Sequence, residues 1–320
     1  MQGLVTVFGG SGFLGVQVVR ALARSGHRVR VAVRQPGLAY RMRMLGDVGQ
    51  IEIVQANIRV PSSVARAVDG AQACVNLVGV LYEAGRQKFA SLHVQGARNV
   101  AEAARDAGVA RLIHISAIGA DAESDSKYAR SKAQGEAAVR EAFPSATILR
   151  PSIVFGHEDH FFNRFGQMSA LAPVLPLIGG GVTRFQPVFV ADVAAAVANA
   201  LQQPASAGAV YELGGPGIYS FKALLELICR ETGHHPLLMP IPFPIASLIG
   251  AVGDLQSMIV APFLTSDQVV LLRRDNVVGS GALGLADLGV AAASVEAITP
   301  SYLYRYRKGG QYADALANGV

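Results

Sequence analysis

Three side chains of this sequence are of the types that move a proton to or from a carbonyl group. Tyr128 and Lys132 stand four residues apart, and Ser116 ends the apolar run Leu112–Ser116. A spacing of four residues places a tyrosine and a lysine on one face of a helix. The cationic lysine would lower the pKa of the phenol from about 10, so that the phenol acts as acid or base. Ser116 would orient the substrate carbonyl.

A glycine-rich stretch follows the first apolar run, Leu4–Phe8, and precedes a segment of helical periodicity. Such a turn needs glycines for positive φ, for close approach of a pyrophosphate to the helix amino end, and for tight packing of helix on strand. At the first turn of a strand-helix-strand unit, this pattern predicts a dinucleotide site. The expected contacts are Gly9, Gly10, Ser11, Gly12, Phe13, Leu14 and Gly15.

The end of the second strand predicts which dinucleotide binds. A carboxylate at this place usually binds the ribose 2′-hydroxyl of NAD. This chain has Val33, Arg34 and Gln35 there, with no carboxylate nearby. An arginine forms a charge-assisted, forked contact with a 2′-phosphate, which a carboxylate would repel. The sequence therefore predicts NADPH, or NADP, rather than NAD.

The N-terminal half alternates short apolar runs with helical patterns, which is typical of a parallel sheet covered on both faces. The sequence predicts helices over Phe13–Ser25, Phe89–Ala107 and Lys127–Ala142. It predicts further strands at Val29–Val33, Ile51–Val54, Ala73–Leu77, Leu112–Ser116 and Ala146–Leu149.

Prolines and glycines become frequent after Pro151, where the character of the sequence changes. We expect a nucleotide-binding domain over residues 1–155, to which residues 186–216 return. Residues 156–320 then form a smaller, partly interleaved C-terminal lobe. The apolar segment Pro236–Gly253 holds four prolines, so we expect it to lie on a surface or in a core rather than to cross a membrane.

Composition excludes several classes of function. The net charge of +5 comes with no stripe of basic and aromatic residues, so no nucleic acid is expected as a partner. An anionic ligand or lipid surface suits this charge better. Cys74 and Cys229 lie in apolar surroundings and are expected to be buried free thiols. His157 and His160 flank two carboxylates, but they are expected in a polar loop, and no metal site is predicted.

The sequence resembles the extended, atypical members of the short-chain dehydrogenase/reductase family. The stretches that carry the resemblance are Tyr128–Lys132, His93–Val100 and Arg150–Ser152. It implies a Rossmann-type α/β fold, a doubly wound parallel sheet with a smaller lobe. His93 is a departure, because extended members often carry asparagine there. The further nucleotide contacts expected for such a protein are Asn57, Ile58, Val78, Gly79, Pro151 and Ile153.

Four longer stretches resemble the NADPH-binding accessory subunits of respiratory complex I, the NADH:ubiquinone oxidoreductase. They are residues 43–50, 128–144, 155–163 and 186–193. This resemblance implies NADPH held structurally, at the junction of the peripheral and membrane arms near the quinone entry. Other complex I subunits and the membrane surface are the implied partners, with residues 240–249 and the tail 302–307 as candidate contacts.

The alanine-rich composition and the absence of a leader suggest a bacterial relative. A peripheral place on the cytoplasmic face of the inner membrane is then expected. Two alternatives stay open at this stage. One is a free-standing NADPH-dependent reductase or epimerase that uses Ser116, Tyr128 and Lys132. The other is a nucleotide-sensing regulator without such chemistry. In the accessory-subunit interpretation the same three residues are vestigial and hold the cofactor.

Overall fold

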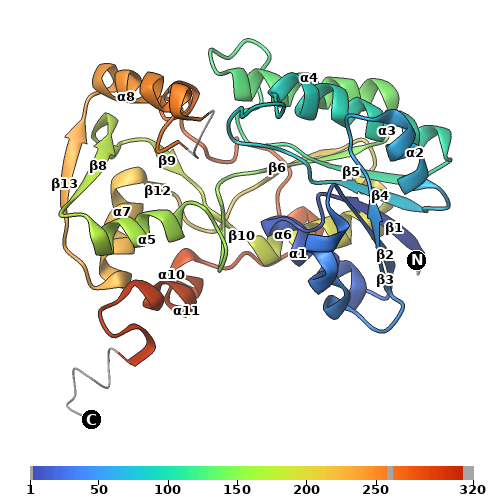
Figure 1. Ribbon diagram of the computed structural model, residues 1–320, viewed down its shortest axis with the longest axis horizontal. Coiled ribbons are helices and arrows are strands. Elements are labelled where there is room, and N and C mark those ends of the chain that lie inside the picture. Colours follow the sequence, from blue (N-terminus) through green and yellow to red (C-terminus); the bar gives the residue numbers. More distant parts are fainter. Residues whose placement is uncertain (1–2, 258–261, 313–320) are drawn as a thin grey trace. The chain divides into compact units, whose positions relative to one another are not determined.

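The structure, a computed structural model, describes residues 3–257 and 262–312 and contains two compact units (Figure 1). The first unit comprises the described residues up to Pro151, together with Val190–Leu213 and Val278–Ala291. The second comprises Ser152–Phe189 and the described residues within 214–277 and 292–320. The expected division into a nucleotide-binding domain and a smaller C-terminal lobe stays a prediction, because it also says what each part binds.

A seven-stranded sheet forms the centre of the first unit, and all its neighbouring strands run parallel. Its order is β11-β6-β5-β4-β1-β2-β3. The strands are β1 (Leu4–Phe8), β2 (Arg28–Val33), β3 (Ile51–Gln55), β4 (Ala73–Asn76), β5 (Arg111–Ile115), β6 (Thr147–Pro151) and β11 (Val210–Leu213). Its central strands are buried on both faces, which explains their continuous apolar runs. The predicted doubly wound α/β fold is confirmed.

Helices cover both faces of this sheet (Figure 1). They are α1 (Phe13–Arg24), α2 (Pro61–Val68), α3 (Gly96–Asp106), α4 (Lys127–Ala142) and α6 (Val190–Gln202). On one face α1 packs on α6, while α2, α3 and α4 form a layer on the other. Short 3₁₀ helices lie at Pro36–Leu45, Pro204–Ser206 and Ala286–Leu288.

The strand order reverses direction at β1, since β2 and β3 follow on one side and β4 to β6 on the other. Open parallel sheets bind ligands at such a switch point, beyond the carboxyl ends of the strands. The loops after β1 and β4 therefore define where a site is expected in this unit.

The helix predicted over Phe89–Ala107 is in fact two different segments. A π-helical turn over Ala90–Gln95 precedes α3, and the Gly96 N–H bonds the Ser91 carbonyl, five residues back. A Cβ on Gly135 of α4 would lie 2.2 Å from the His93 carbonyl oxygen. Helix α4 can thus approach this turn only because position 135 is glycine. The sequence pattern did not reveal the extra residue in the turn.

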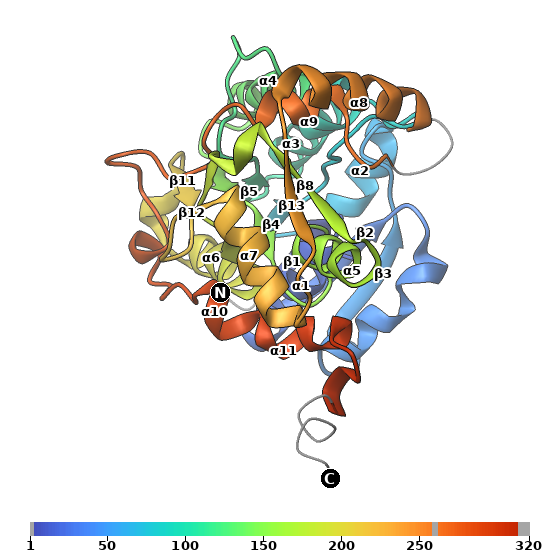
Figure 2. The ribbon, with the colours of Figure 1, turned by 90° about the vertical axis from the view of Figure 1, so that its left-hand side faces the viewer.

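The second unit contains short paired strands and several helices. Its strands are β7 (Val154–Phe155), β8 (Val174–Ile178), β9 (Arg184–Phe185), β10 (Val188–Phe189), β12 (Tyr219–Ser220) and β13 (Leu237–Ile241). Its helices are α5 (Phe162–Leu171), α7 (Phe221–Thr232), α8 (Phe243–Gln256), α9 (Ser266–Leu271), α10 (Val295–Ile298) and α11 (Pro300–Leu303). Strand β13 runs parallel beside β8, as Figures 1 and 2 both show.

A buried carboxylate organises the loop before α5. Asp159 accepts hydrogen bonds from the N–H groups of Phe161 and Phe162 at 2.9 and 2.6 Å. The Tyr302 hydroxyl also donates to Asp159, at 2.8 Å, and Tyr302 and Leu303 are fully buried. The expectation that the tail over 302–307 meets a partner is therefore wrong for Tyr302 and Leu303. These two residues belong to the core of the second unit.

Helix α8 buries little of its apolar surface within the second unit. Ala246, Gly250 and Gly253 are buried. The exposed apolar side chains recur at helical spacing: Ile245, Leu248, Ile249, Val252 and Leu255. Among the described residues, no helix has the length and apolarity needed to cross a membrane.

Candidate dinucleotide site and its proton-transfer residues

The loop after β1 turns sharply and seats α1 directly on the strand end. Gly9 has a φ of +79°, which favours glycine, and its carbonyl accepts a bond from the Gly12 N–H at 3.1 Å. A Cβ on Gly15 would stand 2.3 Å from the Gly9 carbonyl oxygen, and one on Gly10 would stand 2.9 Å from the Val31 side chain. The protein itself therefore requires glycine at 9, 10 and 15.

Gly12 is different, because nothing in the protein requires glycine there. Its backbone is extended, with a φ of −80°, and a Cβ would meet only the Gly9 carbonyl oxygen, at 3.5 Å. Gly12 precedes the first turn of α1, whose N–H groups lack intrahelical partners and which contains no acidic residue. A Cβ at 12 would fill this cradle. The loop therefore fits the pyrophosphate of a dinucleotide, and Ser11, Phe13 and Leu14 lie in the same turn.

The other predicted nucleotide contacts of the first unit follow the carboxyl ends of neighbouring strands. Arg34 follows β2, is exposed, and donates to the Gln87 side-chain oxygen at 3.3 Å. Asn57 and Ile58 follow β3, Val78 and Gly79 follow β4, and Pro151 ends β6. Ile153 lies in the second unit and packs against the core there, and its contact with a nucleotide stays a prediction.

The Lys132 side chain reaches the end of β5, which Ser116 directly follows. The Lys132 ammonium donates to the Ile115 carbonyl at 2.9 Å, and it lies in the interior of the unit. Ser116 is 3% exposed, and its hydroxyl has no hydrogen-bond partner among the described residues. An orphaned buried hydroxyl is costly unless a ligand engages it. Tyr128, one turn before Lys132 on α4, is half-buried, and Ser126 caps this helix by accepting the Ala129 N–H.

Burial lowers the pKa of Lys132 to about 8, from 10.5 in water. Glu136 acts in the opposite direction, because its negative charge favours the ammonium form. Glu136 is itself 1% exposed and accepts two bonds of 2.8 Å from Arg150. This buried ion pair ties α4 to β6. No pattern in the sequence linked positions 136 and 150, because they are distant along the chain.

His93 connects the loop after β4 with α4. Its Nε2 accepts the Val80 N–H at 3.0 Å, so Nδ1 carries the proton and donates to the Ser131 hydroxyl at 2.8 Å. Burial, followed by the Lys132 charge, lowers the pKa of His93 to about 3. The ring stacks on Phe89 and meets the edge of Tyr128. The sequence marked His93 only as a departure, and it gave no sign of the Ser131 or Phe89 contacts.

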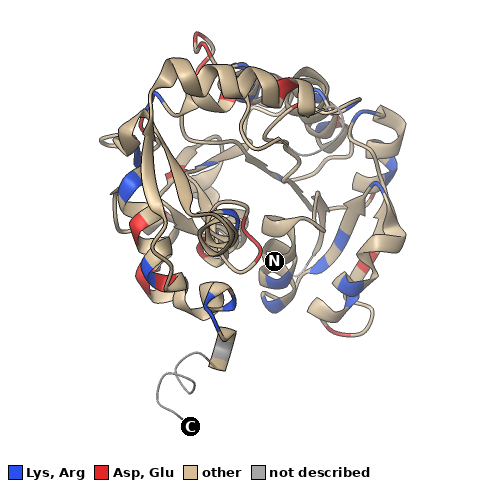
Figure 3. Cartoon of the chain, turned by 60° about the vertical axis from the view of Figure 1, so that its left-hand side comes forward, with Lys and Arg blue, Asp and Glu red and all other residues tan. Residues whose placement is uncertain are grey.

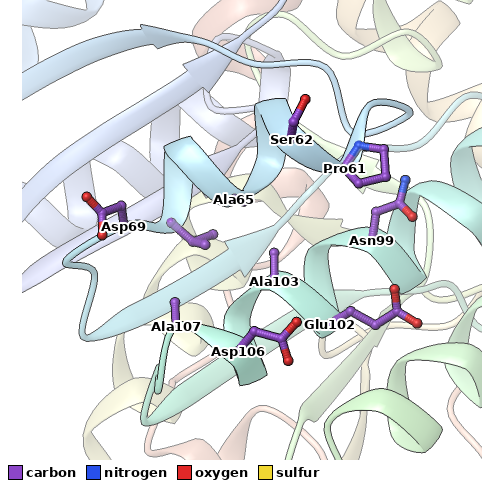
Figure 4. Close-up of a pocket in the computed structure, with 10 residues that line it drawn as sticks. Pro61, Ser62, Ala65, Asp69, Asn99, Glu102, Ala103, Asp106 and Ala107 are labelled. Carbon is purple, nitrogen blue, oxygen red and sulfur yellow. The ribbon is translucent and has the colours of Figure 1, made fainter.

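A surface groove of about 440 Å³ lies elsewhere on this unit, between α2 and α3 (Figure 4). Alanines and Val68 form much of its lining, and Asp69, Glu102 and Asp106 supply carboxylates. It shares no residue with the predicted dinucleotide contacts. A carboxylate-lined groove would also repel a pyrophosphate, so the groove is not the dinucleotide site.

Comparison with known families and solved structures identifies the family of this chain. A profile of the NAD dependent epimerase/dehydratase family matches residues 5–214, and the chain belongs to this family. Among solved structures, the NADPH-dependent quinone oxidoreductase of Escherichia coli, complexed with NADPH, is similar with a TM-score of 0.74 and 20% identity. The similarity covers 94% of this chain and 99% of that one. At this identity the likeness shows the fold alone.

Curated relatives narrow the assignment. NADH dehydrogenase (ubiquinone) 1 alpha subcomplex subunit 9 of Arabidopsis thaliana is 36% identical, over 97% of this chain and 80% of the relative. Within its larger family, this chain therefore belongs to the family of that complex I subunit. A ceramide reductase of Caulobacter vibrioides is 33% identical, over 79% of this chain and 78% of the relative.

The contrast between two glycines yields a test of the cradle. Gly12→Ala should leave the free energy of unfolding within about 1 kcal/mol of wild type, because the added methyl meets no tight contact. It should weaken NADPH binding at least tenfold, because the methyl occupies the place of the pyrophosphate. The matched variant Gly15→Ala should lose about 2 kcal/mol of stability by overpacking. Urea unfolding and nucleotide titration measure both, and unimpaired binding by Gly12→Ala would contradict the site.

The lowered pKa of Lys132 predicts that removing its charge stabilises the fold. Below pH 8 the lysine is charged in both the folded and the unfolded chain, so the full cost of burying its charge is present. Above pH 10.5 it is neutral in both, and this cost is gone. Lys132→Met should therefore raise the free energy of unfolding at pH 7 by up to about 3 kcal/mol. The gain should shrink between pH 8 and 10.5. Chemical denaturation across pH 6–11 tests this, and a gain that grows with pH would refute it.

Proposed function

We propose that this chain is an accessory subunit of respiratory complex I that holds NADPH as a structural cofactor and stabilises the junction of the two arms. The observation that carries the proposal is the 36% identity over nearly the whole chain to subunit 9 of the ubiquinone-reducing NADH dehydrogenase. The same identity holds for the relative in Mus musculus, over 95% of this chain. A likeness of this extent includes both units and goes beyond the shared Rossmann architecture.

The first unit supplies the residues that would hold NADPH. The cradle at Gly12 and the open first turn of α1 suit the pyrophosphate, and the orphaned Ser116 hydroxyl with Lys132 suits the nicotinamide ribose end. Arg34 is exposed beyond β2, without an ion pair among the described residues, and suits the 2′-phosphate. When bound, NADPH supplies a hydride donor, whether or not it is used.

The surroundings of Lys132 favour a structural use of the cofactor. A turnover cycle that oxidises NADPH needs a proton at Tyr128, and His93 is the titratable side chain whose ring meets the Tyr128 ring. Both ring nitrogens of His93 are engaged inside the protein, and its pKa of about 3 keeps the ring neutral. His93 therefore offers no route for a proton beside Tyr128 and Lys132.

The surface of the second unit supports a peripheral place at a membrane. The exposed apolar residues of α8 form a stripe suited to lie in the interface of a bilayer or against an apolar subunit. We place the chain on the cytoplasmic face of a bacterial inner membrane, next to the subunits around the quinone entry.

A second candidate is a free-standing NADPH-dependent reductase. The retention of Ser116, Tyr128 and Lys132 favours it, as does the 33% identity to a ceramide reductase. The buried, unpartnered Ser116 hydroxyl is available to bind a substrate carbonyl. The two candidates differ in whether the bound NADPH reduces a carbonyl substrate or serves only as a structural cofactor.

The choice of nucleotide follows from Arg34. Arg34→Asp should lower the preference for NADPH over NADH by tenfold or more, because a carboxylate repels the 2′-phosphate and accepts from the 2′-hydroxyl. Arg105→Asp, which changes an exposed arginine on α3, is the matched control and should leave the preference unchanged. Titration of both nucleotides measures the ratio. Equal affinity of the wild-type chain for both would defeat the NADPH assignment.

Purification from native membranes tests the accessory role. In a mild detergent the chain should migrate with NADH:ubiquinone oxidoreductase activity, and Tyr128→Phe should leave electron transfer nearly unchanged, since no proton passes through the phenol. A separate, monodisperse protein that oxidises NADPH with a carbonyl compound would support the reductase instead. A large loss of complex I activity in Tyr128→Phe, with the nucleotide still bound, would also count against the structural role.

A further inference from the structure

Positive charge is concentrated at one end of the chain. The first 50 residues contain seven arginines, no lysine and a single carboxylate, Asp47, which gives them a formal charge of +6. The whole chain carries +5, so the other 270 residues together carry −1. A charge asymmetry of this kind along a chain points to an anionic partner.

The 3₁₀ helix at Pro36–Leu45 displays part of this charge beside apolar side chains. Side chains three residues apart eclipse one another in a 3₁₀ helix, so they form rows. Ala39 and Met42 make the buried row. Leu38, Arg41 and Met44 make an exposed row, in which Leu38 is 78% and Met44 81% exposed.

The neighbouring row adds an aromatic side chain, Tyr40, and a second arginine, Arg43. Tyr40 is exposed, and the Arg43 guanidinium lies over its ring, 5.2 Å from the centroid. Val48, just beyond the helix, is fully exposed. Two of the three rows of this helix therefore point into solvent and carry apolar and cationic groups together.

This segment is firmly attached to the rest of the unit. The Gln50 amide donates to the carbonyls of Ala23 and His27, at 2.7 and 3.0 Å. Arg24 and Arg28 directly follow these two residues and are exposed. They therefore lie close to the far end of the 3₁₀ segment. We call Arg24, Arg28, Arg41 and Arg43, with Leu38, Tyr40, Met44 and Val48, the arginine surface. Figure 3 marks the lysines and arginines of the described chain in blue.

The fold engages one of these four guanidinium groups in a local contact, that of Arg43 with the Tyr40 ring. In the described part of the chain none of the four forms an ion pair. Arg30, which lies on β2 with Arg28, does form one, with Glu52 at 2.9 Å. The nucleotide does not explain them either. Arg28 begins β2 and Arg34 follows its end, so the two lie about 20 Å apart at the strand rise of about 3.3 Å per residue.

We propose that the arginine surface docks against an acidic surface of a neighbouring protein subunit. The inference rests on the proposed function and names the part of this chain that faces its partner. Arginine, tyrosine and methionine are enriched at protein interfaces, while lysine is depleted there. The arginine surface contains the first three and no lysine. A protein with a carboxylate rim around an apolar centre fits it better than a lipid surface does.

The test uses complex I solubilised from membranes of a strain that lacks this chain, titrated with the purified chain. Arg41→Glu/Arg43→Glu should bind at least tenfold more weakly than wild type, because opposed charges become like charges. The matched control Arg66→Glu/Arg105→Glu makes the same change of charge at exposed positions of α2 and α3 and should bind within twofold of wild type. NADPH titration and thermal unfolding verify that both variants fold.

A photoreactive side chain at Met44 of the otherwise unaltered chain gives a readout that does not depend on the double variant. It should cross-link to a protein segment rich in aspartate and glutamate. Cross-linking to lipid alone, or weakened binding to phosphatidylglycerol vesicles with unchanged binding to complex I, would overturn the proposal. So would equal binding by the double variant and its control. If the wild-type chain ignores complex I altogether, the proposed function itself has failed.

Discussion

Helix α1 can sit on the end of β1 only because two stretches of backbone touch without a side chain between them. The Gly9 carbonyl occupies the space where a Cβ of residue 15 would lie. This contact fixes the amino end of α1 at the switch point of the sheet, with its first turn open. The N–H groups of this turn are therefore available to a ligand at the carboxyl edge of the sheet. The positions of the loops after β2, β3 and β4 matter chemically only because they line the same edge.

The chemistry-bearing side chains on the other half of the sheet depend on a different balance. Lys132 and His93 are both buried, and burial disfavours the charged form of each. Glu136, which is held by Arg150, supplies the compensating negative charge for the lysine, while Val80 and Ser131 satisfy the neutral imidazole. The result is a buried, hydrogen-bonded arrangement in which, among the described residues, the Ser116 hydroxyl has no partner. Such an arrangement suits the firm holding of a polar ligand better than repeated exchange of protons with water.

The sequence predicted the parts whose signals are local. The glycine spacing, the parallel strands and helix α4 over Lys127–Ala142 depend on neighbouring residues, and the structure has them. The buried thiols Cys74 and Cys229 were predicted for the same reason. The hydrogen bonds of His93 with Val80 and Ser131, the Glu136–Arg150 pair and the burial of Tyr302 depend on residues that are not neighbours along the chain. No periodicity encodes such contacts, so they became visible only in three dimensions.

The π-helical turn at Ala90–Gln95 has a geometric consequence for variation in this protein. It contains one residue more than an α-helix would need, and in a regular helix each residue adds about 100° of rotation. Deleting a single residue there would yield a longer, more regular helix. It would also swing His93 away from Val80 and Ser131 while leaving α3 in place. The extra residue of this turn therefore sets the direction of the His93 side chain relative to α3. A variant without it would need a different side chain to make the contacts around Tyr128.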